Sequence, residues 1–441
     1  PLVAWAVETL VAGGVTEVVV AVPAAERAAF AAALPERVRL VDGGPSRTAS
    51  VRAALGAVPA GAEAVLVHDA ARPLTPPAVV ARVLDALAGL PLEVTPGDAL
   101  SSVTAVLRGG RPGPTVLLRG DMDALPVREA ADVPFRSDTD GVMHACGHDL
   151  HTAMLVGAAH VLAGAREELA GDVVFMFQPG EEGYDGAGKM LAEGLLDASG
   201  SRPQAAYAIH VFSGSFAHGT FATKPGPLMA ASDVLAVTVR GAGGHGSAPH
   251  RTRDPIPAAC EMVTALQTWL SRGIDAQDPV VITVGTFHAG TKNNIIPDLA
   301  EFEATVRTFD PAVRDLVIAG TRRVCEGVAA AHGVEVDVRF VDQYPVTVNT
   351  EGEVDVVGRT VTELFGADRY APMARPITGA EDFSRVTAAV PGAMVFLGAM
   401  PQGADPSGRP DNHSAEASFD DGVLADGVAL HTALALHHLG G

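Results

Sequence analysis

The sequence predicts an α/β protein of several domains, with a doubly wound parallel sheet at the start, a second α/β sheet in the middle and an inserted ferredoxin-like unit. Three observations lead to this prediction. Strands and helices alternate over residues 1–90, three apolar runs between 114 and 210 end in polar residues, and the element order becomes βαββαβ after residue 229. A chain of 441 residues is also long enough for two or three cores.

The first 90 residues have the rhythm of a doubly wound sheet. The expected elements are, in order, helix 2–12, strand 17–22, helix 24–33, strand 38–41, helix 50–58 and strand 64–68. Ligands of such sheets bind where strands end, and Asp69 and Arg72 follow the last of these strands. Any chemistry of this segment is therefore expected near these two residues.

Three strand-like runs in the middle of the chain each give way to acidic or histidine side chains. The runs are 114–119, 173–178 and 205–210, and the side chains are, in the same order, Asp121 with Asp123, Glu181 with Glu182, and His210. If the strands are parallel, their carboxyl ends share one edge of the sheet. We therefore expect these side chains to form one site.

The order of elements changes after residue 229. The expected elements are strand 234–240, helix 255–270, strand 280–287, strand 300–309, helix 312–331 and strand 334–340, followed by helix 354–364, strand 393–397 and helix 420–439. The first six follow the ferredoxin-like βαββαβ order, and the α/β pattern then resumes. We therefore divide the chain into 1–90, 91–228, 229–342 and 343–441, with the second and fourth parts forming one domain.

Composition limits the classes of partner. The formal net charge of −21 disfavours binding to nucleic acid or to anionic lipid, and no apolar run is long enough for a transmembrane helix. The first residues lack the basic leader and cleavage site of a secretion signal, and three scattered cysteines do not suggest a disulfide framework. We expect a cytoplasmic location, and the absence of an initiator Met suggests that the chain's true beginning is missing.

Two short motifs contain side chains that bind metals. They are His-Ala-Cys-Gly-His-Asp at 144–149 and Gln-Pro-Gly-Glu-Glu at 178–182. A thiolate and an imidazole two residues apart, as in Cys146 and His148, can face the same way at a turn. Of two adjacent carboxylates, one can bind a metal while the other accepts a proton from a water that the metal has made acidic.

His210 and His413 add imidazole nitrogens from distant parts of the chain. Together with the thiolate and a carboxylate they exceed what one four-coordinate catalytic ion requires, so we expect two divalent metal ions. The mixture of ligands suits Mn, Zn, Co or Ni better than Mg or Ca. His144 and His151 remain alternatives to His148, because a different local turn would present either of them instead.

Six ordered motifs resemble the dinuclear-metal aminoacylase/carboxypeptidase family, in its hippurate hydrolase and indoleacetyl-amino-acid hydrolase branch. They are 117–126, 144–149, 178–182, Gly243-Gly244-His245-Gly246, Asn294-Ile295-Ile296-Pro297 and Thr378-Gly379-Ala380-Glu381-Asp382-Phe383. The similarity runs from about Leu92 to the end. It implies an α/β metallohydrolase domain with an inserted lid, acting on N-acyl-amino acids or related amides.

The resemblance also implies roles for individual residues. The metal ligands would be Cys146, His148, Glu182, His210 and His413. Glu181 would be the general acid/base, and Asp123 would lie close to the metals, with a helix cap as the alternative role.

In the inserted unit, His245 resembles a histidine that reaches the oxyanion, often from a partner subunit, which makes a homodimer through the lid an expectation. Asn294, Arg307 and Gly379 would contact the substrate, and Asn294 and Arg307 would help to hold its free carboxylate, Arg307 by bidentate pairing. A solvated position on a strand face is the alternative for Arg307.

The N-terminal part is similar to methylerythritol phosphate cytidylyltransferase through the motifs 43–51 and 67–73. This resemblance implies that Arg47, Ser50, Asp69 and Arg72 descend from a cytidine nucleotide site. A Gly-rich phosphate loop with a basic residue and a C-terminal catalytic portion are absent from the sequence, so we expect no cytidylyl transfer.

The junction between the two resemblances falls near residues 87–92 without a flexible linker. We interpret the chain as an in-frame fusion of two truncated domains in which all proposed metal ligands are retained. The alternatives are a nucleotide-binding fragment derived from a cytidylyltransferase, and a fusion whose truncations expose apolar surface and impair catalysis.

Overall fold

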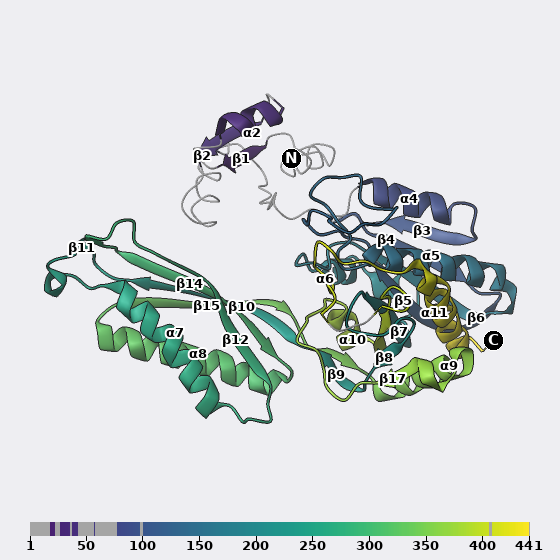
Figure 1. The fold of residues 1–441 in the computed structure, drawn as a ribbon. Helices are drawn as coiled ribbons and strands as arrows, with labels where there is room; N and C mark the ends of the chain where they lie inside the picture. Colours follow the sequence, from purple (N-terminus) through teal and green to yellow (C-terminus); the bar gives the residue numbers. More distant parts are fainter. Residues whose placement is uncertain are drawn as a thin grey trace.

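The computed structural model describes residues 18–22, 27–35, 38–42, 57, 77–97, 100–404 and 408–440. Two bodies dominate Figure 1: a large sheet covered by helices on both faces and a smaller domain that extends to one side of it. Within the described residues, no helix is both long and apolar enough to span a bilayer. The mixed α/β character expected from the sequence is present in both bodies.

The large body is built on a mixed sheet of eight strands in the order β17-β8-β18-β7-β5-β6-β4-β3. The strands are β3 (Leu92–Pro96), β4 (Val103–Arg108), β5 (Arg111–Asp121), β6 (Ala170–Gln178), β7 (Ala205–Phe212), β8 (Phe221–Thr223), β17 (Tyr370–Pro372) and β18 (Gly392–Gly398). The central strands β6, β5, β7 and β18 are parallel and almost wholly buried, as their continuous apolar runs predict. Their carboxyl ends therefore share one edge.

Helices cover both faces of this sheet. One face packs against α4 (Pro77–Leu87), α5 (His148–Gly164), α9 (Glu351–Phe365) and α11 (Leu424–His438), and the other against the shorter α6 (Gly186–Ala192) and α10 (Ser384–Ala389). Val83 and Leu87 of α4 are buried in the same core as α5. This core thus includes a helix that precedes the expected domain boundary at residue 91.

The smaller body contains β10 (Ala231–Arg240), α7 (Pro255–Gly273), β12 (Val280–Ala289), β14 (Leu299–Thr308), α8 (Pro311–His332) and β15 (Glu335–Tyr344). Its antiparallel sheet has the order β12-β14-β10-β15, and both helices pack on one face. Asp254 and Asp310 cap the two helices, each followed by a proline at the first helical position. A ribbon of β11 (Gly244–His245) and β13 (Ile295–Ile296) forms the far tip in Figure 1.

The chain enters and leaves the smaller body at neighbouring points. β9 (Gly226–Met229) comes just before it, β16 (Thr347–Asn349) comes just after it, and the two strands pair antiparallel. At the N-terminus, β1 (Val19–Val22) and β2 (Arg39–Asp42) pair in parallel beside α2 (Arg27–Ala33). The elements expected at 2–12, 50–58 and 64–68 fall outside the described residues, apart from residue 57 alone, as do Arg47, Ser50, Asp69 and Arg72.

Candidate metal centre

The candidate ligands gather where β5, β6 and β7 end. Cys146, His148 and His210 form one group of ligand atoms, and Cys146, Glu182 and His413 form a second. In each group the atoms lie within 4.8 Å of one another. The two groups share the sulfur of Cys146, so the thiol lies between two places where a cation could bind.

Gly147 determines how Cys146 and His148 come to face the same pocket. Its φ of 76° is left-handed, and a Cβ atom at this position would come within 2.4 Å of Val211 Cγ2. Helix α5 begins at the next residue, His148. A glycine is therefore required both by the backbone conformation and by the close approach of β7.

His210 presents one defined nitrogen to the pocket. Its Nδ1 lies 2.9 Å from the Val211 carbonyl oxygen, to which an Nδ1–H donates, and its Nε2 lies 3.5 Å from Cys146 Sγ. The lone pair of Nε2 is then free to bind a cation next to the thiol.

The loop before α11 brings His413 to the same pocket. His413 has a left-handed φ of 69°, its N–H donates to the Ala145 carbonyl at 2.7 Å, and its Nε2 lies 2.9 Å from Glu182 Oε1. Such a conformation is costly for a residue other than glycine, and it persists only where the surroundings enforce it. The neighbouring Asn412 does so by donating to the Val211 carbonyl at 2.9 Å and accepting from Ser213 N–H at 3.0 Å.

Carboxylates surround His148 on two sides. Its Nε2 lies 3.3 Å from Asp121 Oδ2, and its Nδ1 lies 3.3 Å from Asp123 Oδ1. Asp123 also accepts the Glu182 N–H at 3.0 Å, which ties the end of β5 to the acidic turn after β6. The N-cap of α5 is Gly147, so Asp123 does not cap that helix.

The two alternative histidines have different surroundings. Both ring nitrogens of His151 are engaged, since Nδ1 lies 2.5 Å from Asp121 Oδ1 and Nε2 accepts the Val211 N–H at 2.8 Å. His144 is buried with its Nδ1 unpartnered, and it belongs to none of the ligand groups found among the described residues. His148 is thus the histidine of the 144–151 segment that shares a group with Cys146.

The polar atoms of this pocket suit a bound cation. Among the described residues, both ring nitrogens of His148, Asp123 Oδ1 and Glu182 Oε1 are buried without a hydrogen bond of acceptable geometry. Burial alone would lower the pKa of His148, but the Asp121 and Asp123 carboxylates and the Cys146 thiol next to its ring raise this pKa well above its usual value. The adjacent Cys146 thiol and Glu182 carboxylate raise the pKa of His413 to about 10. The pocket therefore favours positive charge, and its thiol, imidazole and carboxyl groups suit a transition metal.

Glu181 lies beside the ligands and is nearly inaccessible to solvent, with 6% of its surface exposed. One of its oxygens lies within 4.8 Å of ligand atoms of His148 and Glu182. Burial and the neighbouring carboxylates of Glu381 and Glu182 raise the pKa of Glu181 well above its usual value. A carboxyl group in this position can accept and return a proton near neutral pH.

A buried arginine lies beneath the pocket. Arg119 of β5 is fully buried and pairs with Asp121 at 2.8 Å and with Glu381 at 2.7 Å, and it donates to Gln178 at 2.9 Å. Gln178 in turn donates to Asp382 at 2.7 Å. Arg119 and its partners all belong to the sequence motifs, but the motifs did not show that they contact one another. The one available signal was that Arg119 is a charged residue within an otherwise apolar strand.

The remaining predicted residues lie in two other places. His245 and Asn294 are exposed at the tip of the smaller body, where Gly246 N–H donates to the Asn294 carbonyl at 2.9 Å and Ser247 N–H donates to His245 Nδ1 at 3.1 Å. Arg307 and Gly379 lie near the start of β10, where the chain enters the smaller body; we call this place the root. Arg307 donates to Ser232 Oγ at 2.7 Å, and the Gly379 carbonyl accepts the Ala230 N–H at 2.9 Å.

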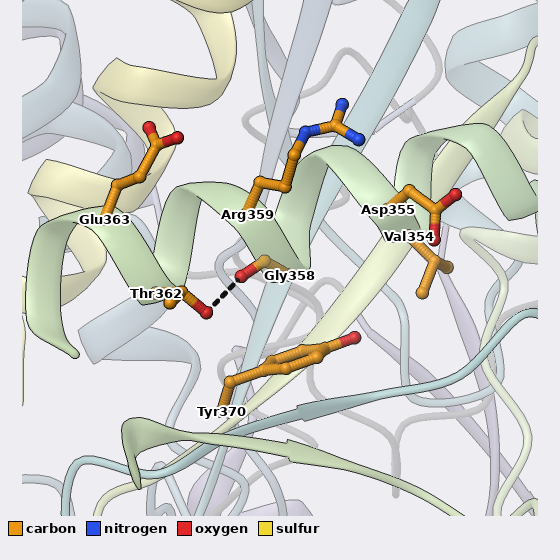
Figure 2. Close-up of a pocket in the computed structure, with 7 residues that line it drawn as sticks. All are labelled: Val354, Asp355, Gly358, Arg359, Thr362, Glu363 and Tyr370. Atoms are coloured by element: carbon orange, nitrogen blue, oxygen red, sulfur yellow. Dashed lines mark hydrogen bonds between the residues drawn. The ribbon is translucent and has the colours of Figure 1, made fainter. Parts of the chain in front are cut away.

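A groove along α9 contains none of the candidate metal ligands. Figure 2 shows the residues that line this groove. Arg359 and Glu363 both project from α9, and the Tyr370 ring lies opposite Gly358. Its volume is about 430 Å³, and the Thr362 hydroxyl donates to the Gly358 carbonyl within it. No residue predicted for the site lines this groove.

Residues 117–437 match the family described as "Peptidase family M20/M25/M40", and residues 1–102 match 2-C-methyl-D-erythritol 4-phosphate cytidylyltransferase. Thermostable carboxypeptidase 2 of Saccharolobus solfataricus is 40% identical over 80% of this chain and 88% of its own. Hippurate hydrolase of Campylobacter jejuni is 36% identical over 77% of this chain and 85% of its own.

A solved structure agrees with these relatives. A Bacillus subtilis protein described as a dinuclear metal-binding peptidase of the M20 family is 31% identical, with a TM-score of 0.69 over 82% of this chain and 92% of its own. Both resemblances expected from the sequence motifs are thus confirmed. The chain belongs to peptidase family M20/M25/M40 and is a metal-dependent hydrolase that acts on amide bonds.

Proposed function

We propose that the chain cleaves N-acyl-amino acids, using two divalent cations held by Cys146, His148, Glu182, His210 and His413. The observation that carries this proposal is the pair of three-atom ligand groups that share the Cys146 sulfur. The donor set suits Mn, Zn, Co or Ni. The hippurate hydrolase relative and the dinuclear solved structure support the substrate class and the number of cations.

The cations, when bound, make a water acidic and polarise the amide carbonyl. Glu181 takes the proton of the attacking water and returns it to the leaving nitrogen. Its burial among other carboxylates supports this role, because such surroundings bring the pKa of a carboxyl group toward neutrality. Asp123 orients its neighbours, since it accepts the Glu182 N–H and faces His148.

We assign residues 229–342 to a ferredoxin-like lid inserted between residues 91–228 and 343–441. The β12-β14-β10-β15 order with two helices on one face supports this assignment. His245 stabilises the oxyanion from the lid of a partner subunit in a homodimer, and its exposure at the lid tip supports a role across an interface. Asn294 lies beside it, while Arg307 and Gly379 at the root hold the carboxylate end of the substrate.

The test is hydrolysis of an N-acyl-amino-acid panel by purified protein that has been stripped with a chelator and reloaded separately with Mn, Zn, Co or Ni. The panel contains N-acetyl, N-benzoyl and indoleacetyl compounds, with unblocked dipeptides as the comparison. We expect two bound ions per chain and turnover of acylated amino acids. Turnover that persists without metal, or binding of a single ion at saturation, would contradict the proposal.

A further inference from the structure

One tyrosine hydroxyl joins the root of the lid to the turn that carries Glu181. Tyr344 is the last residue of β15 and pairs with Ser232 of β10, where the chain passes between the two bodies. Its hydroxyl donates to the Glu181 carbonyl at 2.6 Å and accepts the Gly183 N–H at 2.8 Å. A single oxygen atom therefore holds both ends of the turn 181–183.

A second contact fixes the same two segments to each other. Arg385 donates to the Gln343 carbonyl at 2.8 Å and pairs with Asp185 Oδ1 at 2.5 Å. Gln343 also accepts from Ser232 Oγ at 2.6 Å. The acidic turn is thus joined to the last two residues of β15, directly to Tyr344 and through Arg385 and Asp185 to Gln343.

We propose that Tyr344 is a positioning residue that fixes the Glu181 carboxylate for proton transfer and makes that placement depend on the position of the lid root. This inference rests on the proposed role of Glu181. Because the hydroxyl holds main-chain atoms of Glu181 and Gly183, its loss lets the turn move while every proposed metal-binding side chain, including that of Glu182 in the same turn, is retained. Displacement of a reacting group by about 1 Å can lower the rate roughly 10²-fold.

Tyr344→Phe removes this oxygen alone, and Tyr207→Phe is the matched control. The Tyr207 hydroxyl is also buried and bonds to Glu353 and His438, but Tyr207 packs in the core on the sheet face opposite α6 and α10. We expect Tyr344→Phe to lower kcat by roughly 10- to 100-fold at unchanged KM and metal content. Tyr207→Phe is expected to lower stability and leave kcat unchanged.

Hydrogen exchange at the Gly183 amide provides a readout that is independent of activity. The Gly183 N–H also donates to the Glu181 carbonyl at 2.7 Å, so Tyr344→Phe removes one of its two acceptors. Exchange should accelerate in Tyr344→Phe and stay at the wild-type rate in Tyr207→Phe, because only the first variant takes away the Tyr344 oxygen. Unchanged kcat or unchanged Gly183 exchange in Tyr344→Phe would overturn the inference, as would equal losses of kcat in both variants. If the wild-type protein cleaves no amide in the panel, the proposed function fails, while Gly183 exchange still decides whether Tyr344 holds the turn.

Discussion

The candidate metal centre and the tip of the smaller body, which we propose to be a lid, hold their predicted site residues in opposite ways. In the centre, His148 and His210 are buried, and residues more than 200 positions away, such as Asn412, complete their surroundings. At the tip, His245 is exposed, and its ring nitrogen Nδ1 is hydrogen-bonded to Ser247, two residues away. The candidate centre is therefore organised by the folded chain itself, whereas the role that we propose for His245 requires a second surface.

Glu181→Gln tests the centre with the largest expected effect. Loss of the proton acceptor should lower kcat by about 10²- to 10⁴-fold, while both metal ions remain bound. Thermal stability should not fall, because burial and neighbouring carboxylates already disfavour a charge at this position. Steady-state kinetics together with metal analysis measures both quantities, and wild-type turnover in the variant would refute the assignment of Glu181.

Arg119→Met tests whether distant segments stabilise the centre. It leaves Asp121, Glu381 and Asp382 buried without their cation, so we expect the free energy of unfolding to fall by about 3–5 kcal/mol in urea titrations. The control is Arg339→Met, which removes an exposed pair with Asp337 in the lid and should cost less than about 1 kcal/mol. Similar losses in both variants would remove the contrast between the two regions.

His245→Ala tests the tip. If this imidazole stabilises an oxyanion, kcat should fall by about 10²-fold, whereas melting temperature and metal content should not change because the side chain is exposed. His250→Ala, also exposed in the same loop, is the control and should retain full activity. A drop in melting temperature that matches the drop in rate would instead indicate a structural role.

Deletion of residues 1–76 should have the smallest effect. The described part of this segment has its own small cluster around Leu34 and Phe30, separate from the core that contains the metal centre. We expect kcat/KM and metal content to match those of the full chain when the two proteins are assayed in parallel. A loss of metal binding would show that the N-terminal segment supports the hydrolase.

The sequence predicted the sheet edge that carries the candidate ligands well, because the end of a strand can be recognised from a few neighbouring residues. Apolar runs that stop at Asp121, Gln178 and His210 gave β5, β6 and β7 nearly their observed bounds. The edge strand β3 and its neighbour β4 were not expected. β3 is short and partly exposed, so its alternation with β4 is less distinctive than a buried parallel run.

The network around the centre could not be predicted from local pattern. Arg119 meets Glu381 across 262 positions, and nothing in either segment specifies the other. His151 has the same ligand-type side chain as His148, and only the folded chain shows that both of its nitrogens are engaged. Tyr344 ends an ordinary strand, and its contact with the Glu181 turn depends on how the lid joins the sheet.

The pairing of β9 with β16 has a consequence for how this architecture can diversify. Because the chain departs and returns at adjacent points, the intervening module can be exchanged for another of different length or shape without rethreading the large sheet. Substrate range can then evolve in the exchanged module, while the candidate metal ligands, which all lie outside it, are inherited intact. If Tyr344 positions the Glu181 turn as we propose, each replacement must end in a residue that makes the same two hydrogen bonds.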